Sequence, residues 1–152
     1  MAKELAPLID AEVLSSDKIR KELIPKPIYT KGEKEIVYNA LLVVARYLQN
    51  AGMNCILDAT FNTEKSRREA RDKLNIVRPE HIVIVECICP EDVVISRLKA
   101  RKGDFSDADI SIYRTMKKVY EPVKEEHIIA DTSRDPKIIA QEIETRVKRR
   151  VK

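Results

Sequence analysis

Residues 54–60 of the chain read Asn-Cys-Ile-Leu-Asp-Ala-Thr, and this stretch carries the clearest indication of the fold. A near-continuous apolar run is typical of a strand in a parallel sheet, where both faces are covered and polar residues do not alternate with apolar ones. The run covers residues 54–59, with Asp58 near its carboxyl end and Thr60 two positions further on. The stretch therefore predicts a buried strand that presents an acid and a hydroxyl at its carboxyl end.

Three further segments have the same apolar character. The four predicted strands are residues 12–15, 54–59, 81–89 and 127–131. Glu86 breaks the apolar pattern of the third strand, and the sequence offers no reason for it.

Between the strands, apolar residues recur with the helical period, most clearly over residues 33–51, where Val37, Leu41, Val44 and Leu48 mark one face. The predicted helices are residues 1–9, 18–23, 33–51, 64–74 and 106–120, with two more that open at Pro90 and at Asp135-Pro136. Strands separated by helices indicate βαβ units with right-handed crossovers. The predicted fold class is α/β, a three-layer parallel sheet with flanking helices, in a single domain over residues 1–152.

Composition narrows the class of protein. Of the 152 residues, 43% are hydrophobic and 36% are charged, and the net charge of +4 does not by itself indicate a nucleic-acid partner. No apolar run approaches the ~20 residues that a membrane helix needs, so we expect no membrane partner. Cys55, Cys87 and Cys89 all lie in apolar runs, which favours reduced thiols in a cytoplasmic protein over a disulfide framework.

Ligands of open parallel sheets bind beyond the carboxyl ends of the strands, so the residues that follow each strand are the first candidates for a site. Ser16 and Asp17 follow the first strand, and Arg20 lies three residues further on. A carboxylate in this place can accept a proton from a substrate hydroxyl, and Arg20 can hold an anionic group. The alternative is that Ser16 or Asp17 simply caps the helix over residues 18–23.

Asp58 and Thr60 form the second candidate. An apolar strand that ends in Asp is typical of an acid that holds Mg²⁺ through water in nucleotide enzymes. The alternative is an Asp whose carboxylate accepts hydrogen bonds from loop amides.

Arg97 and Arg101 form the third candidate, since a spacing of four residues places both on one helix face, just before a Gly-Asp loop at residues 102–104. Two adjacent guanidinium groups repel unless an anion such as phosphate lies between them. The alternative is a solvated helix face that is salt-bridged to Glu91 or Asp92. Taken together, two acids at successive strand ends and an Arg pair on a flanking helix are the groups that phosphoryl transfer needs.

The order of these motifs resembles one protein family. The sequence contains SSDxxR at residues 15–20, ILDAT at 56–60, Arg67, CPEDVVISRLKAR at 89–101, GDFSDADxxxYxxxxxxYEP at 103–122 and ADTS at 130–133. This ordered set is similar to the predicted P-loop kinases of the polynucleotide-kinase and zeta-toxin type, and the similarity runs from Met1 to about Ile143.

The resemblance implies an ATP-dependent kinase that uses ATP and Mg²⁺ and acts on a hydroxyl of a small molecule or a nucleic acid. It implies that Asp17 is the base, that Asp58 lies near Mg²⁺, through water, or near the substrate, and that a lid at about residues 97–106 closes Arg97 and Arg101 on the ATP phosphates. The implied catalytic residues are Asp17, Asp58, Arg97 and Arg101, and the implied substrate-binding residues are Ser16, Arg20, Thr60 and Arg67.

One part of the family pattern is missing from the sequence. Such kinases hold the nucleotide phosphates with GxxxxGK[ST], and Gly32, Gly52 and Gly103 are not followed by this pattern. MAKELA, residues 1–6, resembles the helix that follows this loop in relatives. We therefore expect an N-terminally truncated chain that lacks a first strand and phosphate loop of about 13 to 15 residues.

The missing strand would be central, between the strands at residues 54–59 and 81–89. We expect two unpaired strand edges at this point, weak ATP binding by the chain alone, and self-association through the exposed edges.

Two alternatives stay open at this point. The chain is either a kinase seen without its nucleotide loop or a degenerate kinase-like module that binds or regulates without catalysis. The basic tail, residues 146–152, is either a solvated helix end or a nucleic-acid contact.

Overall fold

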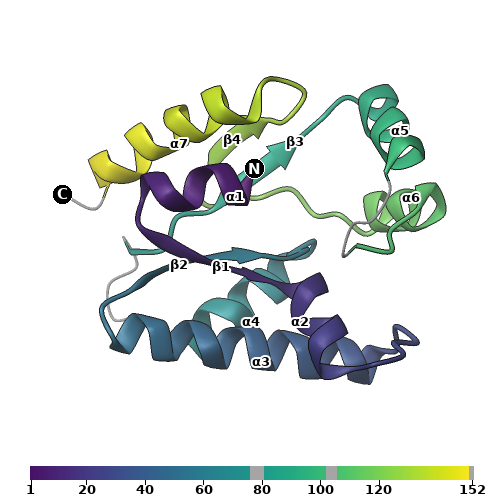
Figure 1. Cartoon of the computed structure of the whole chain (residues 1–152), viewed down its shortest axis with the longest axis horizontal. Helices are drawn as coiled ribbons and strands as arrows, with labels where there is room; N and C mark the ends of the chain where they lie inside the picture. The colour runs from purple at the N-terminus through teal and green to yellow at the C-terminus, as the bar shows by residue number, and fades with distance from the viewer. Residues whose placement is uncertain (76–80, 102–105, 151–152) are drawn as a thin grey trace.

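The computed structural model describes residues 1–75, 81–101 and 106–150, and strands lie at its centre with helices above and below them (Figure 1). The strands are β1 (Ala11–Ser15), β2 (Asn54–Asp58), β3 (Val85–Ile88) and β4 (Ile128–Asp131). The helices are α1 (Ala2–Leu5), the short 3₁₀ helix η1 (Ala6–Leu8), α2 (Ser16–Leu23), α3 (Lys31–Asn50), α4 (Glu64–Leu74), α5 (Glu91–Ala100), α6 (Ile110–Lys118) and α7 (Pro136–Arg150).

The strands form two parallel pairs. β1 pairs with β2, with Val13 opposite Ile56, and β3 pairs with β4, with Glu86 opposite Ile129. In the part of the chain that the structure describes, no strand lies between β2 and β3, so their inner edges carry no ladder of backbone hydrogen bonds. The mixed α/β fold with parallel strands is as predicted, and the two pairs are separate where the sequence predicted a central strand to be missing.

Several element boundaries differ from the prediction. The helix predicted over residues 106–120 begins only at Ile110, because Asp109 is its N-cap, and ends at Lys118. The predicted helix over residues 1–9 divides into α1 and η1, because Pro7 stands at the start of η1 and lacks the N–H that a continuing α-helix needs. β3 is shorter than residues 81–89, because β4 offers only four residues to pair with it.

Two apolar clusters cover the strand pairs. Leu5 of α1 packs with Ile139 and Ile143 of α7 over β3–β4, whereas Leu41 of α3 belongs to a cluster against β1–β2. Ile56 of β2 packs against the first cluster as well, so the two strand pairs share apolar contacts. In Figure 1, α7 and α1 lie above β1 and β2, and α3 and α4 lie below these two strands.

The segment of residues 120–127, here called the strap, connects the two halves through polar contacts. On the α4 side, the Glu121 N–H donates to the carbonyl of Asn62 at 2.8 Å, and the Glu64 N–H donates to the Glu121 carboxylate at 2.7 Å. The Arg67 guanidinium donates to the carbonyl of Pro122 at 3.1 Å and to that of Phe61 at 2.9 Å. These bonds fix the strap to the loop that follows β2.

Glu86 of β3 holds the other side of the strap. Tyr120 Oη donates to one oxygen of the Glu86 carboxylate, and the second oxygen lies 2.9 Å from Nε2 of His127. The Glu86 and His127 side chains are mostly buried, with 19% and 17% of their areas exposed. Glu86 therefore breaks the apolar pattern of its strand because it receives two polar groups of the strap.

Candidate functional site

Asp17 and Ser16 lie in the first turn of α2, directly beyond the carboxyl end of β1. The cap of this helix is Ser15, whose hydroxyl accepts from the Lys18 N–H at 3.5 Å, so neither Ser16 nor Asp17 serves as the cap. Ser16 is buried, and Asp17 is partly exposed. The carboxylate of Asp17 is therefore not committed to capping the helix and stands at the sheet edge where parallel folds bind ligands.

Arg20 is buried one turn further along α2. Only 8% of the residue is exposed, and its Nη1 lies 3.7 Å from the Glu33 carboxylate. Its guanidinium carbon lies 5.0 Å from the centre of the Tyr29 ring. Nε and Nη1 have no hydrogen-bond partner among the described residues. Buried donors without an acceptor are costly, and an anionic ligand is a strong acceptor for a guanidinium group.

Tyr38 of α3 contacts the segment that follows β2. Its hydroxyl donates to the carbonyl of Thr60 at 2.8 Å and lies 3.0 Å from Oγ1 of Thr60, and its ring meets Phe61 edge to face at 5.6 Å. Burial raises the pKa of Tyr38, the two bonds to Thr60 lower it, and the nearby charge of Asp17 raises it. Tyr38, a residue that the sequence did not single out, therefore contacts Thr60 directly and lies within electrostatic range of the charges of Asp17 and Arg20.

Asp58 ends β2, with Ser15 opposite it on β1. Across the gap, burial raises the pKa of the Cys87 thiol, the amino group of Met1 lowers it, and the charge of Asp58 raises it. The ends of β2 and β3 and the start of α1 therefore lie close enough for their charges to interact. This junction is at the carboxyl edge of both strand pairs.

Arg97 of α5 lies at the other strand pair. Its Nη1 donates to the carbonyl of Thr132, just beyond β4, at 2.7 Å. Glu91, a proposed structural partner of the arginines, forms its ion pair with Lys117 at 2.6 Å. Helix α5 ends at Ala100, and Arg101 is its C-cap residue, where the backbone leaves the helix. Of the predicted lid at residues 97–106, positions 102–105 lie outside the described residues.

Arg67, which the sequence placed among the substrate-binding residues, is only 5% exposed. Two of its nitrogens donate to the backbone carbonyls of Phe61 and Pro122. Its guanidinium group therefore joins the loop after β2 to the strap.

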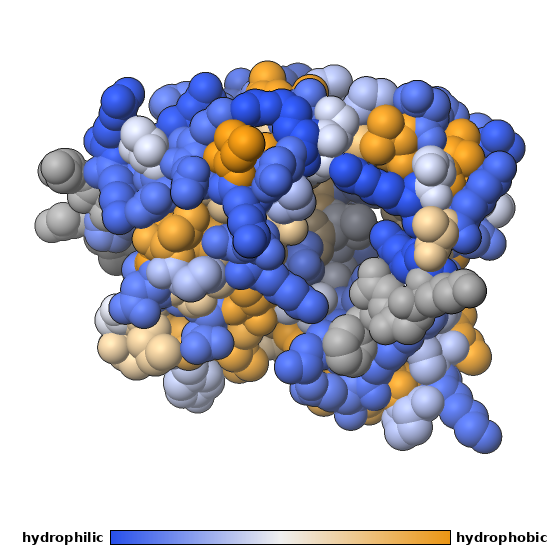
Figure 2. All heavy atoms as spheres, turned by 45° about the horizontal axis from the view of Figure 1, so that its top comes forward, coloured by the Kyte–Doolittle hydropathy of each residue, from blue (hydrophilic) through white to orange (hydrophobic). Residues whose placement is uncertain are grey.

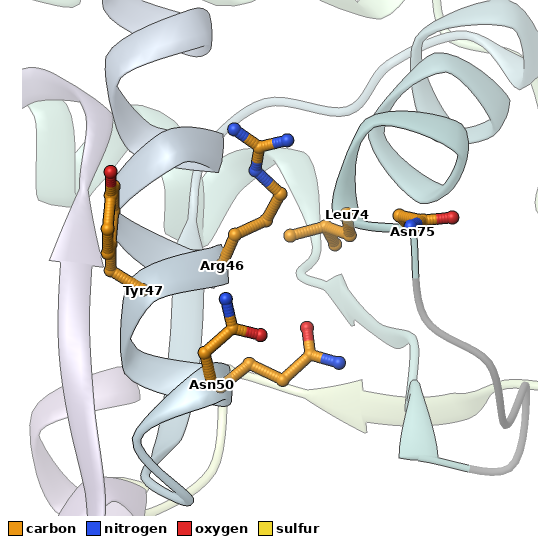
Figure 3. A pocket seen from close by; sticks show the side chains of 6 residues that line it. Arg46, Tyr47, Asn50, Leu74 and Asn75 are labelled. Carbon is orange, nitrogen blue, oxygen red and sulfur yellow. The ribbon is translucent and has the colours of Figure 1, made fainter.

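The molecular surface is hollowed next to the α5–α6 arm, and Figure 2 shows mainly hydrophilic side chains around this hollow, to the right of its centre. A second, shallow pocket of about 320 Å³ lies between the C-terminal ends of α3 and α4. Arg46 and Asn50 face Leu74 there (Figure 3). That pocket is at the amino end of β2 and contains none of the predicted site residues.

The residues that the structure describes contain no group of three His, Cys, Asp or Glu side chains arranged to hold a metal ion. None of the helices described is both long enough and apolar enough to cross a membrane.

Comparison with known proteins gives related sequences. The family model described as "AAA domain" matches residues 1–123. An uncharacterized protein of Mycobacterium tuberculosis strain H37Rv is 31% identical over 126 residues, which is 74% of this chain and 25% of that protein, and an uncharacterized protein of Mycobacterium bovis matches to the same extent. The chain thus spans about a quarter of the length of these relatives.

Solved structures give the fold. A sugar kinase from Janibacter sp. HTCC2649 superposes with a TM-score of 0.72 at 16% identity, covering 95% of this chain and 83% of that one. A gluconokinase from Sinorhizobium meliloti 1021 gives 0.67 at 16% identity, with 97% and 83% covered. The Mycobacterium tuberculosis APS kinase, solved with AMPPNP and APS, gives 0.66 at 18% identity, with 97% and 90% covered. The chain belongs to this AAA-domain family, and its fold is that of the P-loop kinases.

Proposed function

We propose that this chain forms the acceptor-binding part and the lid of an ATP-dependent phosphotransferase, which acts on a hydroxyl group of a small molecule or a nucleic acid. The observation that carries the proposal is that Asp17 and the buried Arg20 share helix α2 just beyond β1, within electrostatic range of Tyr38, whose hydroxyl bonds to Thr60 just beyond β2. An acid that does not cap its helix stands there beside a buried arginine whose Nε and Nη1 lack acceptors. This pair suits an acceptor that carries both a hydroxyl and an anionic group.

In this proposal each residue has one task. Asp17 accepts the proton of the attacking hydroxyl as general base. Arg20 binds the anionic part of the acceptor, while Ser16 and Thr60 line its pocket and Arg67 supports the pocket wall from behind. Arg97 and Arg101, from the lid, neutralise the charge of the transferred phosphoryl group.

The carboxylate of Asp58, at the end of β2, is a suitable ligand for a magnesium ion. Mg²⁺ commonly keeps several waters and takes one or two carboxylates besides the substrate phosphates, so a single acid at a strand end suffices. Asp58 would hold the ion through water. Bound Mg²⁺–ATP supplies the phosphoryl group and screens its charge.

The nucleotide loop is the part that these 152 residues do not contain, since GxxxxGK[ST] is absent from the sequence. We propose that a strand and a phosphate loop from polypeptide outside the 152 residues occupy the gap between β2 and β3. The 152-residue chain alone then binds ATP weakly, because loop amides supply much of the affinity for phosphates. Its exposed strand edges also favour self-association. We further propose that the protein acts in the cytoplasm.

The test uses the polypeptide at the length at which it occurs in its own cells, established by intact mass. Transfer of the labelled γ-phosphate of ATP is measured on sugars, nucleosides and 5′-hydroxyl oligonucleotides. Loss of a general base predicts that Asp17→Asn lowers kcat by about 10²- to 10⁴-fold with little change in the KM for ATP. Glu22→Gln, a carboxylate loss on the exposed side of α2, is the control. Equal kcat values for Asp17→Asn and the control would refute the role of Asp17.

A second candidate is a kinase-like module that binds a partner without catalysis. It is favoured by the two separate strand pairs together with the absence of GxxxxGK[ST] from these residues. A native polypeptide of these 152 residues that shows no heat of ATP binding in calorimetry would support this module over the kinase.

A further inference from the structure

Tyr29 and Asp107 connect two distant parts of the chain. Tyr29 lies in the loop between α2 and α3, just before Thr30, the N-cap of α3, and Asp107 lies shortly before α6. The Tyr29 hydroxyl donates to one oxygen of the Asp107 carboxylate, and Lys21 Nζ of α2 lies 2.9 Å from the other. Both oxygens of Asp107 are therefore bound by groups of the α2–α3 unit, which carries the candidate acceptor site.

The loop is held firmly at the position of Tyr29. The residue has a φ of 59°, in the left-handed region that side chains rarely adopt. Glu33 accepts hydrogen bonds from the Tyr29 N–H at 2.6 Å and from the Ile28 N–H at 2.9 Å. A non-glycine residue keeps such a conformation only where its surroundings hold it, and such positions are common at ligand sites.

The Tyr29 ring reaches the candidate site itself. The guanidinium group of Arg20 lies 5.0 Å from the ring centre, a distance suited to a cation–π contact. Arg20 is more than nine-tenths buried, and its Nε and Nη1 have no acceptor among the described residues. The contacts therefore run from Asp107 to the Tyr29 hydroxyl, and from the Tyr29 ring to Arg20.

We propose that Asp107 is a positioning residue of the acceptor site: by holding Tyr29 and Lys21, it fixes the Tyr29 ring over Arg20, so that Nε–H and Nη1–H of Arg20, which lack a hydrogen-bond partner among the described residues, face an anionic group of the acceptor. This rests on the proposed function, because it takes Arg20 as the anion-binding residue. It adds that α6 and the acceptor site are coupled, since Asp107 lies shortly before the N-cap of that helix, Asp109.

The first measurement is the ¹H–¹⁵N signal of the Arg20 Nε–H group in the whole 152-residue chain. The ring current of Tyr29 shifts this signal while the ring lies over the guanidinium group. We expect Asp107→Asn and Tyr29→Phe to move the signal away from its wild-type position. In Asp107→Glu, which keeps a carboxylate, and in the control Glu22→Gln, the signal should stay at the wild-type position. An unmoved signal in Asp107→Asn refutes the positioning role, whatever the chain binds.

The second measurement is the binding of inorganic phosphate, followed by the same signal. We expect Asp107→Asn and Tyr29→Phe each to weaken phosphate binding about tenfold, and the double variant to be no weaker, because the two residues act through one contact. Arg20→Gln should abolish the binding. Phosphate binding that needs Arg20 but not Asp107 would overturn the positioning role and keep the anion site. Binding that survives Arg20→Gln would instead overturn the role of Arg20 in the proposed function.

Discussion

Replacing Arg67 by methionine tests whether this residue holds the fold together or binds substrate. The side chain is buried and gives two hydrogen bonds to carbonyls, at 2.9 Å to Phe61 and 3.1 Å to Pro122. A hydrogen bond from a charged group contributes about 1.5 to 3 kcal/mol. Methionine keeps the apolar packing of the stem, so we take the lower figure for each bond and expect a loss of about 3 kcal/mol in the free energy of unfolding.

The assay is equilibrium unfolding in urea, followed by circular dichroism. With a slope of about 2 kcal/mol/M for a chain of this size, the midpoint of Arg67→Met should fall by roughly 1.5 M. Arg68→Met, at an exposed position of the same helix, is the matched control and should stay within about 0.5 kcal/mol of the wild type. Equal midpoints for the two variants would refute the structural role and return Arg67 to the candidates for substrate binding.

Three further results are expected. In an alkaline titration followed at 295 nm, one tyrosine should ionise near pH 12, because burial and the bond to Asp107 raise the pKa of Tyr29 to about 12. The protonated Tyr29 stabilises the fold fully below pH 10, and this contribution is lost as the pH rises through 12. Asp107→Asn should lower the pH at which this tyrosine ionises. Glu86→Gln should lower stability by about 1 to 3 kcal/mol, and adding Tyr120→Phe should cost little more if both act through one contact. Leu41→Ala, at a fully buried position of α3, should cost about 2 to 5 kcal/mol in urea unfolding, and a cost below 1 kcal/mol would place Leu41 outside a packed core.

The sequence predicts the features of this protein that repeat along the chain. Apolar runs locate the four strands, and the acids at the ends of the first two follow from their position alone. The separation of β2 from β3 agrees with the expectation drawn from the family resemblance, which places a further strand between these two. Local signals are enough to locate the strands and helices, since each leaves a pattern of apolar residues within a short window of the sequence.

Contacts between distant side chains leave no such pattern. Nothing near Tyr29 in the sequence indicates that its hydroxyl meets Asp107, and nothing near Glu86 indicates that Tyr120 and His127 meet its carboxylate. Such pairings depend on how loops return in space, which composition and periodicity do not record.

The packing of α1 against α7 has a consequence for the order in which the chain acquires its structure during synthesis. Leu5 is buried by Ile139 and Ile143, which the ribosome adds more than 130 residues later. At about 5 to 20 residues per second, α1 waits on the order of ten seconds before its partner exists. β1, α3 and β2 are complete well before that time and can assemble first. The apolar face of α1 is therefore exposed on the nascent chain until the last helix emerges, which makes it a natural binding site for a chaperone during that interval.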